Sequence, residues 1–470
     1  MPIAGKLVVF AVLLALISVP CFAACHAVTP AGSGSKSGAD WSNAYAKLPA
    51  TLTRGDTYYL ADGTYGGYTV NTSGSTQVII KKATAGDHCT NTGWNASTMG
   101  SSQAVFSGIV ASSGSGNGNF TFDGNGTSSA PGCGTANGGA ASDCGIKIDN
   151  STCSGSSADA CDSPILLSVY NGTASTGVVF RYMEWAGNNN NNSERNFMYA
   201  PQTAGSSFTL DHVYGHDTGC VYIQQYGGTH TVKNSYFWKN YSNSSGCHGQ
   251  YAYYSGSVSN FSEFNNVYRD IEGTSVFTFG SNTSSSNVQI YNNVFWYSNP
   301  PLRTGTGDGI ISCINSSSCT NFTVAQNVIA NVQGSYDTGI QVIDGATSSG
   351  WIVENNIWYG NKVNIALNFS GTEDYNSFLN NSSNPGGGSH DTKSTSAPIP
   401  FVNWAGGNFN LASQNSLWSN GASLASTFAV DPAGNPRPGT DGVWNRGAYE
   451  YANGQAQAPN PPTNLVATVQ

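Results

Sequence analysis

A short phrase that recurs between Phe208 and Asn361 constrains the fold of this chain more than any other feature. Each copy has an apolar residue, a spacer, an Asn or His, a second spacer and a large apolar residue. The copies are Leu210-x-His212-x-Tyr214, Val232-x-Asn234-x-Tyr236, Phe264-x-Asn266-x-Tyr268 and Tyr291-x-Asn293-x-Phe295, with weaker copies at Ala325-x-Asn327-x-Ile329 and Glu354-x-Asn356-x-Trp358. The central residues are 22, 32, 27, 34 and 29 positions apart. A repeat of this length that carries strand patterns predicts a solenoid.

The physics of the phrase explains this prediction. A period of two places the first, third and fifth residues on one face of a strand. If each copy is one coil, the large apolar residues stack into a continuous core and the central Asn residues form a ladder at a tight turn. The alternative is an antiparallel β-sandwich. It is disfavoured because the two-residue hairpin turns that it needs do not occur between successive copies.

The pattern resembles the right-handed parallel β-helix of the pectate-lyase-like superfamily, which implies an all-β fold. Three more stretches support the resemblance. Residues 55–65 resemble the first coil of many secreted β-helix proteins, and residues 398–411 and 431–451 resemble the closing segments of bacterial ones. From Ser37 to Leu48 the apolar spacing turns helical, so we expect a short amphipathic helix, N-capped by Asp40, over the open N-terminal end of the solenoid.

Composition indicates an exported protein with a large core. Only 9% of the 470 residues are charged, Gly contributes 57, and 24 Tyr, 20 Phe and 10 Trp exclude disorder. The net charge of −9 and the lack of a basic patch argue against a nucleic-acid partner. Residues 1–23 read as a signal peptide, with a lipoprotein anchor on Cys25 as the alternative, and no later segment is apolar enough to span a membrane. We therefore predict a secreted bacterial monomer.

The domain boundaries follow from these features. Residues 1–23 are the signal peptide and residues 24–451 the β-helix with its two caps. Residues 452–470 are a linker that ends in what resembles the first strand of a fibronectin type III module.

Ten cysteines remain after removal of the signal peptide, and an even count in an exported chain predicts disulfides. Proximity along the chain favours Cys133–Cys144, Cys153–Cys161 and Cys313–Cys319. Cys220 and Cys247, about one coil apart, can join neighbouring coils, which leaves Cys25 with Cys89. No CxxC pair occurs, so a thiolate metal site is disfavoured.

Charged residues, which are scarce in this chain, gather in and beside the repeats. Counting four and five positions on from the central residues brings His216, Asp217, Lys239 and Asp270 together across three neighbouring coils. Nearby in the sequence lie His248, Arg269, Glu272, Arg303 and Asp308. The competing interpretation is structural, because Asp and Asn in solenoid turns commonly bond their own backbone.

Two chemistries fit this cluster. Uronate β-elimination needs a cation to neutralise the sugar carboxylate, a base for the C5 proton and an acid for the leaving oxygen. Glycoside hydrolysis needs two carboxylates across the scissile bond, for which Asp217, Asp270 and Asp308 are candidates. We predict Lys239, His248, Arg303 and His216 as catalytic residues, Trp238, Tyr297 and Arg269 as substrate-binding residues, and Asp217, Asp270, Glu272 and Asp308 as ligands of a candidate calcium ion.

The catalytic motifs of the related families are mostly absent. The stretch from Cys247 to Gly280 resembles the active coils of chondroitinase B-like and alginate lyases in layout, but it lacks their Lys-Ser pair. The sequence Gly307-Asp308-Gly309-Ile310 resembles one motif of the polygalacturonases, but the other motifs of that family are missing. We therefore expect a polysaccharide-acting protein, foremost a lyase of acidic glycans. The alternatives are a non-catalytic carbohydrate-binding or adhesive solenoid and a polygalacturonase-like hydrolase.

Overall fold

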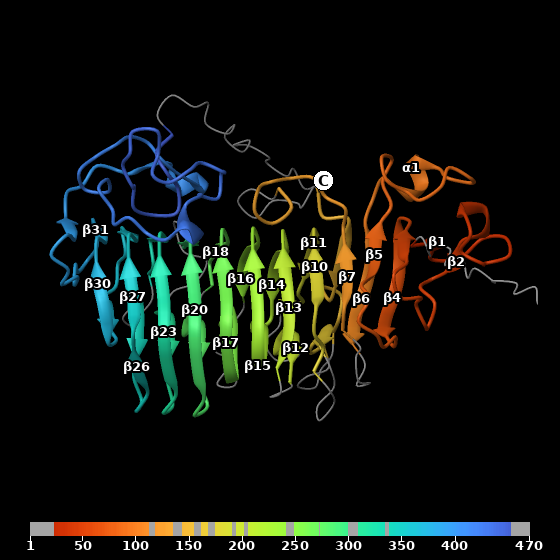
Figure 1. The fold of residues 1–470 in the computed structure, drawn as a ribbon, viewed down its shortest axis with the longest axis horizontal. Helices are drawn as coiled ribbons and strands as arrows, with labels where there is room; N and C mark the ends of the chain where they lie inside the picture. Colours follow the sequence, from red (N-terminus) through yellow and green to blue (C-terminus); the bar gives the residue numbers. More distant parts are fainter. Residues whose placement is uncertain are drawn as a thin grey trace, which may run out of the picture.

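The structure, a computed structural model, describes residues 23–111, 118–134, 143–154, 161–167, 174–189, 194–201, 205–240, 249–271, 273–298, 309–333 and 338–452. Its 32-stranded sheet is built from strands that pair in parallel. Parallel neighbours need a crossover between them, and here the chain makes that crossover by winding once around a common core. The predicted parallel β-helix is confirmed. Figure 1 shows its strands side by side along the long axis, from red N-terminal coils to blue C-terminal coils.

Each complete coil contributes strands to three faces, numbered in the order in which the chain passes them. The first face contains β9 (Ile165–Leu167), β12 (Asn196–Ala200), β15 (Val221–Lys233), β17 (Ala252–Phe264), β19 (Ser275–Phe279), β22 (Gly309–Cys313), β25 (Thr338–Val342) and β29 (Ile365–Asn368). The long strands β15 and β17 bend and continue into the second face.

The second face precedes the tight turn of each coil. It contains β1 (Cys25–Thr29), β3 (Thr57–Leu60), β5 (Val78–Lys82), β7 (Phe120–Asp123), β10 (Val178–Arg181), β13 (Ser206–Asp211), β20 (Ser284–Tyr291), β23 (Ser318–Ala325), β26 (Thr347–Ser349), β27 (Trp351–Glu354) and β30 (Gly371–Asp374).

The third face follows that turn. It contains β4 (Gly63–Val70), β6 (Ala104–Ala111), β8 (Ile146–Asp149), β11 (Met183–Ala186), β14 (Tyr214–Thr218), β16 (Tyr236–Asn240), β18 (Val267–Arg269), β21 (Val294–Trp296), β24 (Val328–Ala330), β28 (Ile357–Tyr359), β31 (Ser377–Leu379) and β32 (Thr392–Ser394). The strands β4 and β6 continue from this face into the first.

The core consists of inward side chains that stack from coil to coil, as the period of the phrase predicts. On the third face Phe237, Tyr268 and Phe295 are 0 to 1% exposed. Their rings stack in sequence, with centroids 6.0 and 5.1 Å apart. Burial of large aromatic rings supplies much of the stability of such a fold.

The predicted asparagine ladder is present over the later coils. Asn266, Asn293 and Asn327 each donate their backbone N–H to the Oδ1 atom of the Asn one coil further on, at 2.9, 2.9 and 3.0 Å, and Asn356 and Asn376 extend the ladder. These residues are almost completely buried. The ladder therefore pairs backbone groups that the tight turn would otherwise leave unsatisfied.

His212 and Asn234, which the phrase places in the same ladder, lie one position earlier in the turn. They belong to an outer turn row, whose members have positive φ angles of 51 to 59°: His212, Asn234, Asn265, Asn292, Gln326 and Asn355. Ser235 occupies the ladder position beside Asn266. The register prediction is thus wrong by one residue for the first two copies, and it is correct from Asn266 onward.

The two ends of the solenoid are covered differently. At the N-terminal end the expected helix is reduced to a 3-10 turn, Trp41–Asn43, in which the Asp40 side chain accepts from the Asn43 N–H as predicted. The strand β2 (Tyr45–Ala46) follows and pairs with β1. The α-helix α1 (Ala96–Met99) is a single turn, and Trp94 just before it packs on Trp41.

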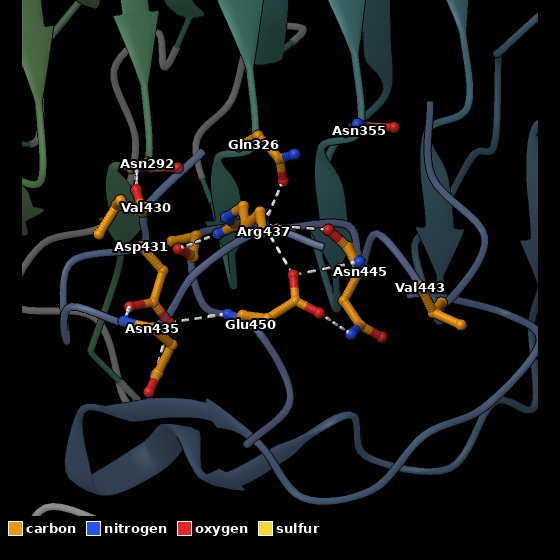
Figure 2. Close-up of polar contacts among 12 residues, drawn as sticks. Asn292, Gln326, Asn355, Val430, Asp431, Asn435, Arg437, Val443, Asn445 and Glu450 are labelled. Carbon is orange, nitrogen blue, oxygen red and sulfur yellow. Dashed lines mark hydrogen bonds and ion pairs between the residues drawn. The ribbon is translucent and has the colours of Figure 1, made fainter. Parts of the chain in front are cut away.

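The C-terminal segment, residues 397–452, folds back over the third face of the last coils (blue in Figure 1). It contains the antiparallel pair β33 (Phe401–Asn403) and β34 (Asn408–Leu411), and the 3-10 turns Trp404–Gly406 and Ser426–Phe428. Figure 2 shows how it is held. Asn292 donates to the Val430 carbonyl at 2.8 Å, and the buried Arg437 donates to Gln326 at 2.5 Å. The outer turn row is therefore the attachment line for this segment.

Four of the predicted disulfides are confirmed: Cys25–Cys89, Cys133–Cys144, Cys153–Cys161 and Cys313–Cys319. The first uses the sulfur atom that a lipid anchor on Cys25 would need, which contradicts lipidation of this form. Cys220 is disulfide-bonded, while Cys247 lies outside the described residues, so their pairing stays a prediction.

Among the described residues, none of the helices has the length and apolar character needed to cross a membrane. The signal peptide and the fibronectin-like start fall almost wholly outside the described residues and remain predictions.

Candidate functional site

Five charged side chains form a row across consecutive coils on the outer side of the third face. Lys147 lies on β8, Glu184 on β11, His216 and Asp217 on β14, and Lys239 on β16. Their side chains are 13 to 30% exposed, so they are accessible without being fully solvated. Neighbouring coils are spaced by about 4.8 Å, the ordinary distance between paired strands.

The row alternates in charge and is connected by direct contacts. Lys147 Nζ lies 3.3 Å from Glu184 Oε1, and Glu184 Oε1 lies 3.2 Å from His216 Nε2. His216 Nδ1 lies 2.9 Å from Asp217 Oδ2, and Asp217 in turn contacts the Lys239 ammonium group. The row, called here the charged row, brings together three of the residues that the sequence predicts to meet.

The backbone explains why Asp217 and Lys239 lie side by side. Both have positive φ angles, 56 and 59°, at the point where the chain leaves the third face. Asp270 has the same conformation, with φ of 52°, one coil further on. One position earlier, His216, Trp238, Arg269 and Trp296 are direct neighbours in register. The count from the phrase aligns Asp270 with Trp238, which is the one-residue error described above.

The contacts of the row shift the pKa values of its members. Burial alone would raise the pKa of Glu184, but His216, Gln103 and Lys147 outweigh it and lower the pKa to about 2. Burial likewise opposes the charged forms of Asp217 and His216. Their mutual hydrogen bond, with Lys239 on one side and Glu184 on the other, lowers the pKa of Asp217 and raises that of His216. The imidazole is therefore biased towards its cationic form.

Beyond Lys239 the outer surface becomes aromatic. The Arg269 guanidinium lies between two indole rings, 5.2 Å from the centroid of Trp238 and 4.5 Å from that of Trp296. Such contacts favour a cation held against a ring face. Trp238 is partly exposed, as a sugar-stacking residue has to be, whereas Trp296 is buried.

Two of the predicted roles do not agree with the geometry. Tyr297 is only 3% exposed and its hydroxyl donates to the Ile271 carbonyl at 2.7 Å, so it belongs to the core and cannot be an exposed sugar platform. Asp270 is 1% exposed, and its oxygens accept from Ser298, Trp238 and Arg269. This carboxylate is already satisfied by the protein.

Calcium ligation finds no support in the part of the chain that the structure describes. Its described residues contain no group of three His, Cys, Asp or Glu side chains arranged to hold a metal ion. The Asp217 carboxylate contacts His216 and Lys239, and the Asp270 carboxylate already accepts the hydrogen bonds described above. The other predicted site residues, His248, Glu272, Arg303 and Asp308, lie outside the described residues.

A second candidate region, which the sequence analysis missed, lies on the outer side of the first face. A cleft of about 370 Å³ is lined there by Tyr199 of β12, Gln224 and Tyr226 of β15, and Tyr253 of β17, with Arg195 and Asp162 at one end. Tyr199, Gln224 and Tyr253 are direct neighbours in register. Partly exposed phenol rings and amide groups suit the apolar faces and the hydroxyl groups of sugars.

The two regions border the same corner of the β-helix. The charged row ends where the chain leaves the third face, and the cleft begins where the chain enters the first, at Cys220 and Gln250. The fully buried Glu194 holds this corner, because its carboxylate accepts from Thr218 Oγ1 at 2.6 Å and from the Gly219 N–H at 2.8 Å. Burial raises the pKa of Glu194 despite these bonds.

Comparisons with known proteins yield distant structural matches. A pectate lyase, Pel9A, aligns with a TM-score of 0.47 and 12% identity over 91% of this chain and 96% of its own. A mannuronic acid specific polysaccharide family 6 lyase from human gut microbiota aligns with a TM-score of 0.34 and 11% identity, over 76% of this chain and 80% of its own. No family model and no curated protein sequence matches the chain. The fold assignment therefore depends on the strand pairing described above.

Proposed function

We propose that this protein acts on an extracellular acidic polysaccharide, which it binds at the corner between the third and first faces and cleaves by β-elimination. The observation that carries the proposal is the charged row. Lys147, His216 and Lys239 present cationic groups within four neighbouring coils, with Glu184 on the coil between Lys147 and His216, beside a cleft lined by tyrosines and amides. A glycan that carries one carboxylate per repeat can place several carboxylates along such a series of cations.

The reaction assigns different work to the members of the row. Lys147 neutralises the uronate carboxylate, which favours removal of the neighbouring C5 proton. His216, whose raised pKa favours the imidazolium ion, donates a proton to the leaving glycosidic oxygen. Lys239 remains the candidate base, and its ammonium group has to leave Asp217 and release its own proton to solvent before the neutral amine accepts the C5 proton.

Two observations bear on the alternatives. The pKa values of Glu184 and Asp217 are lowered, so neither supplies the protonated carboxylic acid that a glycoside hydrolase needs. All the cations of the charged row already contact carboxylates, and this self-neutralisation favours the second candidate function, a solenoid that binds a glycan without cleaving it. Export of the chain, which the four disulfides favour, belongs to both proposals.

A screen of pectate, alginate and glycosaminoglycans tests the proposal, with calcium or a chelator present in parallel samples. Elimination creates a double bond conjugated to the carboxylate, so we expect ultraviolet absorbance to rise on at least one substrate. His216→Ala and Lys239→Ala should each lower the rate by about 100-fold or more. Lys362→Ala, which removes an exposed lysine away from the row, is the matched control and should leave the rate unchanged.

The other outcomes are equally informative. Binding without absorbance change, lost in Lys239→Ala, would replace the lyase by the binding solenoid. Release of reducing sugar without a new double bond would indicate a hydrolase. Loss of activity on chelation would restore the calcium prediction, with ligands beyond the described carboxylates. No binding and no turnover on any acidic glycan would overturn the proposal.

A further inference from the structure

A second and larger cleft lies away from the charged row, beside the tight turns of the coils. It has a volume of about 590 Å³, within the range of small-molecule sites. Its floor is formed by His212, Asn234 and Asn265 of the outer turn row. Its walls come from Ser129, Ala130 and Pro131 on one side and from the C-terminal segment on the other. In Figure 1 these two coverings, orange and blue, lie on the same edge of the β-helix.

The floor presents amide groups whose hydrogen bonds are only partly used. Asn292 donates to Asn265 at 3.3 Å, Asn265 donates to Asn234 at 3.2 Å, and Asn234 donates to Asp211 at 3.0 Å. Each side-chain amide has two N–H groups. Within the described residues, the second N–H of Asn234 and of Asn265 has no acceptor. The floor therefore offers evenly spaced hydrogen-bond donors.

Both walls are fixed in position by contacts to this same row. Gly132 donates its N–H to the Asn234 carbonyl at 2.9 Å, and the Cys133–Cys144 disulfide closes the loop behind it. On the other side, Asn292 donates to the Val430 carbonyl. The cleft is thus held open by the fold, which lowers the cost of ordering a site when a ligand binds.

The C-terminal wall is aromatic. The partly exposed Tyr449 lines it together with Phe409, which is only 3% exposed, and Val430, also in the lining, is 52% exposed, one of few large apolar residues exposed to this degree in the described chain. Aromatic and aliphatic surface next to amide donors is the arrangement that receives a sugar ring, whose faces are apolar and whose edges carry hydroxyl groups.

Charge restricts the ligand further. The residues that line the cleft include no Lys or Arg. They include Asp431, whose carboxylate accepts from Ala433 and Asn435 N–H groups at 2.9 and 2.8 Å and so stabilises its own turn. Asp211 lies directly behind Asn234. Asp211 itself does not line the cleft and is paired with Lys233 and His212, so an anionic ligand would meet the Asp431 carboxylate and neither a Lys nor an Arg side chain, which disfavours its binding.

From these observations we propose that the cleft binds one or two residues of a neutral saccharide, at a site separate from the charged row. The ligand's hydroxyl oxygens accept from Asn234 and Asn265, and its ring packs on Tyr449 and Val430. This inference does not rest on the proposed reaction, because the two sites select ligands of different charge.

The test is calorimetric titration of the full chain with a panel of neutral disaccharides of gluco, galacto and manno configuration. Asn265→Gly removes the amide while glycine accepts the positive φ of 58°. We expect it to weaken binding about tenfold or more, as loss of ligand hydrogen bonds should. Asn287→Gly is the matched control, since Asn287 has a φ of 56° and a similar amide contact, to Asn260, on another turn. It should leave binding unchanged.

A second variant guards against a purely structural effect of Asn265→Gly. Val430→Arg adds a long side chain at the exposed mouth without touching the floor, and should also abolish binding. Lys239→Ala should leave neutral-saccharide binding intact even where it abolishes action on acidic glycans. The proposal fails if no neutral saccharide binds the wild-type protein, or if Asn265→Gly and Val430→Arg bind as the control does.

Discussion

Glu263 is a carboxylate inside the core of the β-helix, with no exposed surface. Its Oε1 atom lies 3.0 Å from His230 Nε2, and its Oε2 atom accepts from the Tyr268 hydroxyl at 2.7 Å. The other ring nitrogen of His230, Nδ1, is hydrogen-bonded to Gln225 Oε1 at 2.9 Å. A buried charge is tolerated only when its partners are satisfied together. This group therefore acts as one unit that joins the coils of β15, β17 and β18.

Two replacements of Glu263 show how much of its contribution to stability comes from accepting hydrogen bonds and how much from its carboxylate. Glu263→Leu should lower the free energy of unfolding by about 3–5 kcal/mol, because it leaves the buried Tyr268 hydroxyl without its acceptor and His230 Nε2 with only the longer contact to the Tyr254 hydroxyl, at 3.3 Å. Glu263→Gln keeps an acceptor oxygen and should cost clearly less. Urea denaturation monitored by circular dichroism measures both. Equal stability of Glu263→Leu and wild type would show that the core rearranges to satisfy these groups.

The pKa of His216 provides a test of the charged row that does not require a substrate. Glu184→Gln removes one of the two carboxylates that favour the imidazolium ion, so the pKa of His216 should fall, as measured by NMR titration of the ring. Glu354→Gln, far along the solenoid, should not change it.

The same shifts imply a pH dependence of stability. His216 has a raised pKa, so its contribution is complete below about pH 6.5 and is lost as pH rises through the folded value. Glu184 has a lowered pKa, so its contribution is present above about pH 4.5 and is lost as pH falls towards 2. Thermal melts of wild type and Glu184→Gln should therefore converge at acid pH.

At the scale of one element, the asparagine ladder is the part of each turn that holds neighbouring coils together. Asn327 accepts from the Asn293 N–H at 2.9 Å and donates to the Ile290 carbonyl at 2.9 Å and to Asn356 at 3.0 Å. Asn327→Ala should cost about 3 kcal/mol, since it leaves buried backbone groups without partners. Asn287→Gly, in an exposed amide row, should cost less than about 1 kcal/mol. Denaturant titrations that gave equal losses would contradict a special role for the ladder.

The sequence predicts this element well and its register only in part. In the later copies two adjacent polar residues occupy the turn, as in Asn265-Asn266, and the phrase selects the buried second one. In the first two copies Val213 or Ser235 occupies the ladder position, so the same pattern selects the outer position, His212 or Asn234, which carries the positive φ. Alternation with period two does not distinguish these cases, because both place an apolar residue two positions later.

The cleft on the first face was beyond prediction for a related reason. Tyr199, Gln224 and Tyr253 are uncharged, and none of them belongs to the repeated phrase. They are neighbours in register although their spacing along the chain differs from coil to coil, so no fixed period in the sequence reveals them. The charged row, by contrast, was found because charge is scarce in this chain and because Asp217 and Lys239 follow the repeated phrase at equal distances.

At the scale of the whole molecule, the C-terminal segment connects several of the last coils by covering their outer side chains. In a solenoid each coil contacts mainly its neighbours, so a segment that reaches across several coils adds cooperativity. This one covers the outer apolar side chains Trp296, Val328 and Ile357 with Phe401, Phe409 and Trp418. Arg437, buried at 3% exposure, fastens it by donating to Gln326 and to the carbonyls of Asn445 and Gly447 (Figure 2).

Arg437→Leu should therefore release this segment before the coils unfold. The substitution leaves Glu450, which lies 3.6 Å from the guanidinium, and several carbonyl groups without their buried cation, a loss of about 3–5 kcal/mol. Hydrogen exchange should accelerate in β21, β24 and β28, whose outer side chains the segment covers, and stay slow in β13. Lys362→Ala should change neither region. Acceleration throughout the chain would instead mean that the segment and all coils unfold as one cooperative unit, and unchanged exchange in β24 would mean that apolar packing alone holds the segment in place.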